Sequence, residues 1–302
     1  MNQQQHIESY LSFCNEAKLP IFYHPHWLDQ AAGEGQWDVR LLYDEQGAAK
    51  MAWPFQKVRK WGMNALLNPR MTSYLGPVAS GLLKEEDLAA LYHKLPRHLL
   101  LEQKINPDVD LSKTPDDRIQ RIPSPTYLLN LEQEEDRLFE NMKESLRRQI
   151  RKAERNLEFE SGNPEELALL FDAALRGKVG RNLLPLPRLT GLLDLLKGDN
   201  GFLLAARASG HLLGGIAIVR NFRSYYYLIG AQSDKGREIA AMSGLMWAAI
   251  REARSREASL FDFEGSSIPS IARFFSSFGA EIGVQITWRQ APGLILRMLK
   301  KS

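Results

Sequence analysis

The sequence predicts an α/β fold with a mixed sheet, an α+β arrangement in two units of similar plan. At 302 residues, the chain is about twice as long as a typical domain. Residues 201–280 alternate strand-like apolar runs with one long helical pattern. The strand, turn and longer strand at 203–222 repeat in pattern the segment at 41–59. Together these three observations favour a duplicated α/β unit.

The segment 201–280 carries the clearest pattern. Its expected elements are, in chain order, strands at 201–207, 212–219 and 225–231, a helix at about 239–256 and a strand at 259–265. Gly210 can adopt a positive φ between the first two strands, which predicts a β-hairpin. We expect a compact unit with a site at its strand ends.

The N-terminal half predicts the same kinds of element. They are, in chain order, helices at 6–17 and 25–32, strands at 37–43, 49–58 and 63–67, a helix at 84–95 and a strand at 99–105. Pro20 stops the first helix and Gly33 the second. Four prolines and several charges make 107–125 a predicted surface crossover.

A short strand at 127–131 and a long helix at 132–156 open the second half. The remaining expected elements are helices from 163 to 176, from 187 to 197 and from 294 to 301, and a strand at 284–289. The long helix should bury an apolar stripe that includes Leu146 and Ile150. We therefore expect one domain at 1–130 and a second at 131–302.

Composition limits the classes of protein that fit. Apolar residues make up 44% of the chain and charged residues 25%, which fits folded cores rather than disorder. Cys14 is the single cysteine, so no internal disulfide can form and a reducing compartment is expected. No apolar run approaches the roughly 18 residues of a transmembrane segment. We expect a soluble cytoplasmic protein, and the sequence leaves its oligomeric state open.

Basic residues cluster in the second half of the helix at 132–156. Arg147, Arg148 and Arg151 lie among further lysines and arginines, and these are more basic residues than the helix dipole alone would favour. The forked guanidinium group of arginine suits phosphate oxygens. An ordinary solvated helix face explains the same residues. Lys178 and Arg181, beside two glycines, are a weaker candidate for the same anion-binding role.

The turn after the aromatic strand is a second candidate. Between Ala231 and Arg237 it should place free backbone N–H groups at a helix N-terminus, where phosphate binds well, with Gln232 and Gly236 inside it. Most strand-to-helix turns of this kind bind nothing, so the ordinary turn remains the alternative.

Two carboxylates and two phenols are the candidates for acid–base chemistry. Asp262 and Glu264 alternate with phenylalanines, so both should face away from the core if the phenylalanines face it. Either could serve as a general base for an amine, and Tyr225 or Tyr227 could donate a proton to a leaving group. Pairing of the acids with local bases such as Arg273 is equally consistent.

No metal site is expected. His24 and His26 have no third ligand nearby, and the sequence holds neither a nucleophile-elbow motif nor an H-E-x-x-H motif.

The order of these motifs resembles a known superfamily. The basic helix Met142–Arg155, the strands at 213–219 and 225–230, the helix at 244–253 and the run Phe261-Asp262-Phe263-Glu264-Gly265 are similar to the GNAT acyltransferase fold. With the duplication, they look like the tandem-GNAT, Fem-type peptidoglycan aminoacyltransferases and their acetyltransferase-like relatives. The resemblance covers 131–288 well, and it implies a degenerate first GNAT-like domain.

The resemblance also implies an activity. It implies transfer of an acyl or aminoacyl group to an amine, with acyl-CoA or aminoacyl-tRNA as co-substrate, no tightly bound cofactor, and a peptidoglycan precursor as one acceptor. The donor carbonyl would meet backbone N–H groups around Gly230 and Ala231, which act as an oxyanion hole. The chain departs from the pattern at two places. The loop before Gly236 is one residue longer than in acetyl-CoA enzymes, and Ala31 stands where Fem-type enzymes carry a lysine.

A second hypothesis accounts for these departures. The chain could be a non-catalytic binding protein on a degenerate GNAT fold, with the basic helix holding tRNA or an anionic membrane surface. The apolar and basic segment 294–301 would then lie on the membrane, or pack on its own domain.

Overall fold

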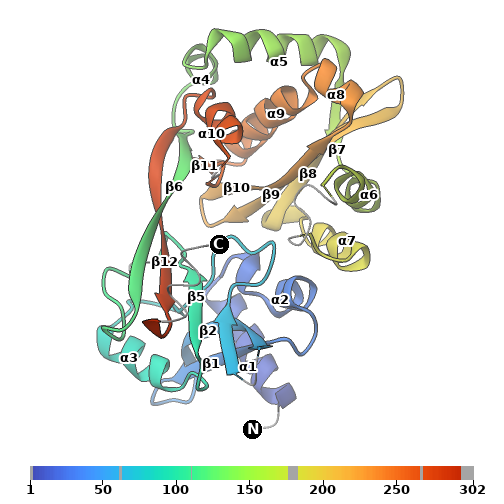
Figure 1. The fold of residues 1–302 in the computed structure, drawn as a ribbon. Helices are drawn as coiled ribbons and strands as arrows, with labels where there is room; N and C mark the ends of the chain where they lie inside the picture. The colour runs from blue at the N-terminus through green and yellow to red at the C-terminus, as the bar shows by residue number, and fades with distance from the viewer. Residues whose placement is uncertain (1–2, 61–62, 110, 176–182, 266–267, 294–302) are drawn as a thin grey trace. The chain divides into compact units, whose positions relative to one another are not determined.

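The computed structural model describes residues 3–60, 63–109, 111–175, 183–265 and 268–293. Lys178, Arg181 and the helix expected at 294–301 lie outside these ranges. The chain forms two compact units (Figure 1): unit 1 comprises 1–124 and 285–302, and unit 2 comprises 125–284.

Unit 1 contains the helices and strands of the N-terminal half. These are α1 (Gln3–Glu16), η1 (Ile21–Tyr23), α2 (Pro25–Ala32), β1 (Trp37–Tyr43), β2 (Ala49–Lys60), β3 (Met63–Leu67), β4 (Val78–Ala79), α3 (Glu85–His93) and β5 (Leu100–Lys104). β1, β2 and β3 pair antiparallel in succession, and β5 then pairs parallel with β3. All the helices and strands expected here are confirmed within a few residues.

Unit 2 repeats this plan. Its elements are α4 (Glu135–Glu140), α5 (Glu144–Asn156), β7 (Glu158–Ser161), α6 (Pro164–Leu175), α7 (Leu186–Asp194), η3 (Gly198–Asn200), β8 (Gly201–Ala208), β9 (His211–Asn221), β10 (Ser224–Gln232), α8 (Asp234–Glu238), α9 (Ala241–Ser255), β11 (Leu260–Asp262) and α10 (Pro269–Ser276). β8, β9 and β10 pair antiparallel, and β11 pairs parallel with β10. The predicted hairpin is confirmed, with Gly210 at a φ of 78°.

The last strand of each unit comes from the other half of the chain. β6 (Gln120–Asn130) follows β5 in sequence, yet its C-terminal part pairs antiparallel with β11 in unit 2. β12 (Glu281–Gln290) follows the elements of unit 2, yet its C-terminal part pairs antiparallel with β5 in unit 1. The units therefore differ from the expected division at residue 130, because each half donates one strand to the other.

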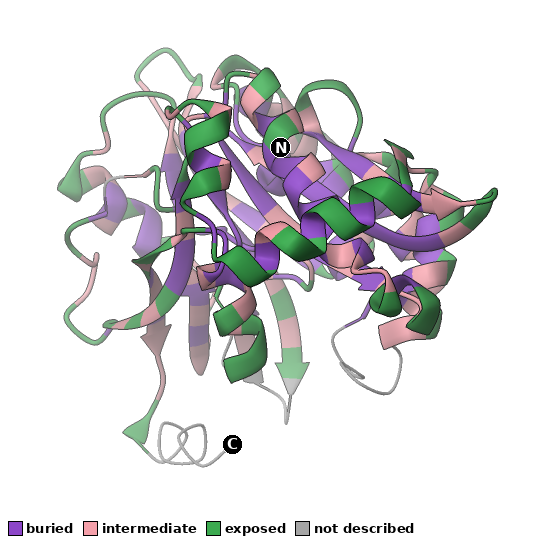
Figure 2. Ribbon diagram, turned by 90° about the horizontal axis from the view of Figure 1, so that it is seen from above, coloured by how far each residue is buried: buried purple, intermediate pink, exposed green. Residues whose placement is uncertain are grey.

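Helices cover both faces of the unit 2 sheet. Two neighbouring glycines of β9 show how closely the helices pack on the strand. A Cβ on Gly214 would lie 3.1 Å from Leu245 of α9, and one on Gly215 would lie 2.2 Å from Leu167 of α6. The strands are mostly buried, whereas the helices keep exposed outer stripes (Figure 2). The core between the sheet and α5 and α9 includes Leu146, Ile150 and Phe261.

The single helix expected at 132–156 is in fact two helices. α4 ends at Glu140, and α5 begins at Glu144 after a turn. The backbone N–H of Lys143 donates to the carbonyl of Ser277 at 2.9 Å, so this amide is used outside the helix. A tertiary hydrogen bond that the local sequence does not reveal thus interrupts the helical pattern. The predicted apolar stripe is nevertheless buried.

Four further segments differ from expectation. β6 begins at Gln120, inside the segment expected to be a crossover, and β11 ends at Asp262 rather than at 265. α10 and β7 were not expected. Within the described ranges, no helix combines the length and apolar character that a bilayer crossing requires.

Candidate functional site

The most irregular strand of unit 2 is β10. Its register against β9 shifts between Tyr227 and Ile229, which makes Leu228 the extra residue of a β-bulge. Its parallel pairing with β11 stops at Tyr226, opposite Asp262. From Tyr227 onward, therefore, β10 pairs with β9 alone in the described ladder, and the backbone groups of its other edge can meet a substrate.

Tyr227 and Glu264 lie together beside this open edge. A Cβ on Gly230 would lie 2.7 Å from the Tyr227 hydroxyl, so the phenol lies over the backbone of Gly230. Burial raises the pKa of Tyr227, and the nearby negative charge of Glu264 raises it further. The ring of Phe275 in α10 packs edge-on against Tyr227 at 6.0 Å between centroids. Tyr227 thus has a carboxylate near enough to interact with it electrostatically, and the two groups are the candidate acid–base pair of this site.

Asp262 occupies a different environment from Glu264. It lies opposite Tyr226 in the β10–β11 pairing, while Phe261 lies opposite Tyr225, so Asp262 faces away from the core that holds Phe261. Its side chain is only 2% exposed, and Oδ1 accepts hydrogen bonds from Thr126 Oγ1 at 2.5 Å and from the Glu264 backbone N–H at 2.7 Å. Asp262 therefore holds β6 against the end of β11.

Strand alternation ends between the two carboxylates. β11 ends at Asp262, and Glu264 has a φ of 60°, so its side chain does not follow the pleat. The strand expected to carry both carboxylates therefore stops before Glu264, although Phe261 and Phe263 both lie in the core as the expectation required. Tyr225 is also unlike Tyr227, because it is 1% exposed and packs on Phe202 inside the core.

A cavity of about 490 Å³ opens at the end of β10. Its walls come from α5, the end of β10, α8, the start of α9 and α10. The residues that line it are Gln149, Lys152, Gln232, Arg237, Glu238, Ala240, Met242, Ser243, Ser270, Ile271 and Phe274. Phe274 packs against Phe275, the ring that contacts Tyr227, so the cavity and the acid–base pair share α10.

Lys152 and Arg237 supply positive charge to this cavity. Lys152 Nζ donates to the Glu238 carbonyl at 2.7 Å, and Arg237 reaches the exposed Asp234 at 3.0 Å. Both partners are solvent-accessible groups that an anionic ligand could replace. Ser243 donates to Gln149 Oε1 at 2.9 Å and so joins α9 to α5 at the cavity wall.

Two amides of the expected anion site at 231–237, those of Gly236 and Arg237, already have acceptors within the protein. The Gly236 N–H donates to Ser233 Oγ at 3.0 Å, the Arg237 N–H to the Ser233 carbonyl, and the Met242 N–H at the start of α9 to Gln232 Oε1 at 3.0 Å. These amides are occupied because the extended loop folds into the short helix α8. Gly236 is required for packing, since a Cβ there would lie 2.3 Å from the Leu213 carbonyl oxygen.

The residues of the basic helix that line the cavity are not the ones that the sequence indicated. α5 contributes Gln149 and Lys152, three positions apart and so on one helical face. Arg148 pairs with Glu144 at 3.5 Å, Arg151 lies over the Phe139 ring at 5.4 Å, and Arg147 is half-buried; none of the three lines the cavity. Lys152 could have been identified if the face of α5 that lines the cavity had been known. The sequence does not reveal which face that is, because it depends on the fold.

Metal-ligating side chains do not gather in the part of the chain that the structure describes, where no group of three or more could hold an ion.

Comparison with known proteins supports this assignment of the fold. Residues 140–269 match the sequence family described as acetyltransferase (GNAT) domain. No curated protein matches the chain.

Solved structures share the fold over the whole chain. FemX is 16% identical with a TM-score of 0.66, covering 100% of this chain and 99% of its own. The C-terminal domain of a putative lysylphosphatidylglycerol synthetase from Agrobacterium fabrum is 11% identical with a TM-score of 0.64, covering 99% and 95%. A tandem GNAT protein from the clavulanic acid biosynthesis pathway is 12% identical with a TM-score of 0.50, covering 95% of each chain. At these identities the likeness shows the fold, a tandem GNAT arrangement.

Proposed function

We propose that this chain, a GNAT-fold protein of the Fem-like acyltransferase superfamily, transfers an acyl or aminoacyl group to an amine. The observation that carries the proposal is the open edge of β10, which has the Tyr227–Glu264 pair beside it and a cationic cavity at its end. A donor held in the cavity would present its carbonyl to that edge, whose N–H groups stabilise the developing oxyanion.

The Tyr227–Glu264 pair accounts for the proton transfers of the reaction. The acceptor amine attacks the donor carbonyl carbon and gives a proton to the Glu264 carboxylate. The bond to the leaving oxygen or sulfur then breaks, and that atom takes a proton from the Tyr227 phenol. Transfer of the proton from Glu264 to the Tyr227 phenolate restores both groups, so protons balance over one turnover.

We favour an aminoacyl-tRNA over a CoA thioester as donor. A diphosphate is usually cradled by backbone N–H groups at a helix start, and here the amides of Gly236, Arg237 and Met242 already have acceptors. Lys152 and Arg237 instead offer side-chain charge, which suits the phosphates of an RNA end. The Fem-type resemblance makes an amine of a cell-wall precursor the expected acceptor.

The test is donor binding to the full chain and to two matched variants. Lys152→Ala removes a cavity cation, and Arg148→Ala removes an equally exposed cation of α5 outside the cavity. We expect charged tRNA to bind, Lys152→Ala to weaken it about tenfold, and Arg148→Ala to change it less than twofold. Tight binding of acetyl-CoA without tRNA binding would contradict the choice of donor. Binding of tRNA that neither variant changes would contradict the assignment of the cavity.

A further inference from the structure

A second cavity, of about 460 Å³, lies in unit 1, and the proposed transfer reaction does not use it. Three segments far apart in sequence form it: the end of α3 with the connection that follows it towards β5, the loop before β6, and the end of β12. Its polar lining consists of Tyr92, His93, Arg97, His98, Arg118 and Gln290. Four of these six side chains are arginines or histidines, which is a composition suited to an anion.

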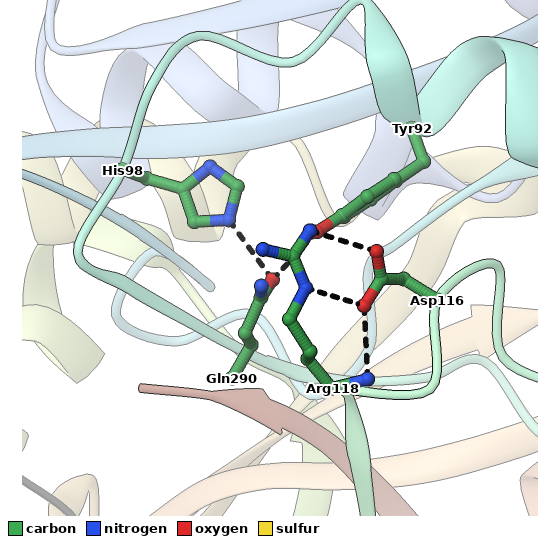
Figure 3. A network of polar contacts seen from close by, with 5 residues as sticks. All are labelled: Tyr92, His98, Asp116, Arg118 and Gln290. Atoms are coloured by element: carbon green, nitrogen blue, oxygen red, sulfur yellow. Dashed lines mark hydrogen bonds and ion pairs between the residues drawn. The ribbon is translucent and has the colours of Figure 1, made fainter. Parts of the chain in front are cut away.

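Arg118 is held in place at this cavity by a carboxylate (Figure 3). Its Nε and Nη2 donate to the two oxygens of Asp116 at 2.8 Å each, and Nη2 lies 3.4 Å from the Tyr92 hydroxyl. Hydrogen bonding to Arg118 lowers the pKa of Asp116 to about 2. The pair is therefore ionised and fixed, and these bonds use Nε and Nη2 but not Nη1.

Gln290 links the remaining polar groups (Figure 3). Its Oε1 accepts from the Tyr92 hydroxyl at 2.9 Å and lies 3.2 Å from His98 Nε2, while His98 Nδ1 lies 2.8 Å from the Pro96 carbonyl oxygen. Both partners of the imidazole are carbonyl oxygens, which can only accept. Both ring nitrogens of His98 are therefore engaged within the protein.

The charges around the cavity do not cancel. Asp116 is matched by Arg118, which leaves the exposed Arg97 in excess. A helix dipole favours cations in the last turn of the helix, and its effect falls off within a turn. The dipole therefore does not account for Arg97, four residues beyond the end of α3, or for Arg118 from another segment.

We propose that this cavity binds the phosphoryl group of a small ligand. Two guanidinium groups, with the imidazole of His93 in the same lining, match an oxyanion that accepts several hydrogen bonds at once. Leu95, Pro96 and the ring of Tyr92 give the cavity an apolar wall for the rest of such a ligand. The three segments would then be tied together by the ligand as well as by the bonds of Gln290 and Arg118.

The test is a titration of the full chain with inorganic phosphate, followed through the histidine ring signals in NMR spectra. Sodium chloride at matched ionic strength is the reference, and His93→Gln and His98→Gln assign the two signals. We expect saturable shifts of both signals with phosphate but not with chloride. Arg97→Ala should weaken phosphate binding at least fivefold, whereas Arg70→Ala, an exposed arginine of unit 1 outside the cavity lining, should change it less than twofold.

Two results would overturn the proposal. One is a non-saturating shift that chloride reproduces, which indicates general screening. The other is saturable binding that Arg97→Ala and Arg70→Ala weaken equally, which indicates a surface effect without a site. Lys152→Ala, which tests the unit 2 cavity, should leave the phosphate affinity of this cavity unchanged, so the two proposals fail separately.

Discussion

Replacing Asp262 and Glu264 one at a time should separate a structural carboxylate from a catalytic one. Asp262→Asn keeps the shape of the side chain, so its oxygen can still accept from Thr126 and from the Glu264 N–H. Each bond changes from charge-assisted, worth about 1.5–3 kcal/mol, to neutral, worth about 0.5–1.5 kcal/mol. Over two bonds, the free energy of unfolding should fall by about 2–3 kcal/mol. The rate of acyl transfer should change only a few-fold.

Glu264→Gln should give the opposite result. Glu264 is half-buried after the end of β11, so we expect its loss to change the free energy of unfolding by less than about 0.5 kcal/mol. Loss of a general base should lower kcat by about 10²–10⁴. One variant should therefore lose stability and keep activity, and the other should lose activity and keep stability, so each serves as the control for the other.

Urea unfolding followed by fluorescence, together with a transfer assay, measures both quantities. A loss of about 2.5 kcal/mol corresponds to a midpoint lower by about 1 M urea for a slope of about 2–3 kcal/mol/M. If Asp262→Asn abolished transfer and left the midpoint unchanged, the roles of the two carboxylates would be reversed, and the argument from the end of β11 would be refuted.

Three further predictions concern stability and reactivity. Gly236→Ala should lower stability by about 1–3 kcal/mol, because its Cβ would lie 2.3 Å from the Leu213 carbonyl oxygen; an unchanged melting temperature would contradict this close packing. Burial raises the pKa of Cys14 to about 12, so its thiol should not react with a disulfide reagent at pH 8 until the protein unfolds, and fast labelling of the native protein would be inconsistent with that burial. Arg118 lowers the pKa of Asp116, so their pair stabilises the fold above about pH 4, and this contribution is lost as pH falls through about 2; Asp116→Asn should therefore melt lower than the wild type at pH 6 and by much less at pH 2, and a difference at pH 2 as large as at pH 6 would contradict the ionic origin.

Local patterns predicted the elements that depend on neighbouring residues. The hairpin around Gly210 and the buried stripe through Leu146 and Ile150 follow from turn chemistry and helical spacing, and both are confirmed. The GNAT resemblance likewise depended on elements in sequence order and is confirmed for the fold.

Features set by distant contacts could not be predicted in this way. The exchange of β6 and β12 depends on their pairing with β11 and β5, strands that are distant in sequence. The break before α5 depends on the hydrogen bond from Lys143 to Ser277. The role of Lys152 depends on which face of α5 meets the cavity. The amides of Gly236 and Arg237 have acceptors, against expectation, because the longer loop allows α8 to form and to use them.

The most direct test of the account is a single-turnover transfer assay with labelled aminoacyl-tRNA and an amine-bearing cell-wall precursor peptide. The wild type should place the label in a new amide, identified by mass spectrometry, and Tyr227→Phe and Glu264→Gln should each slow this step at least a hundredfold without weakening tRNA binding. Amide formation at the wild-type rate in both variants would contradict the central claim that the open edge of β10 and the Tyr227–Glu264 pair form the transfer site.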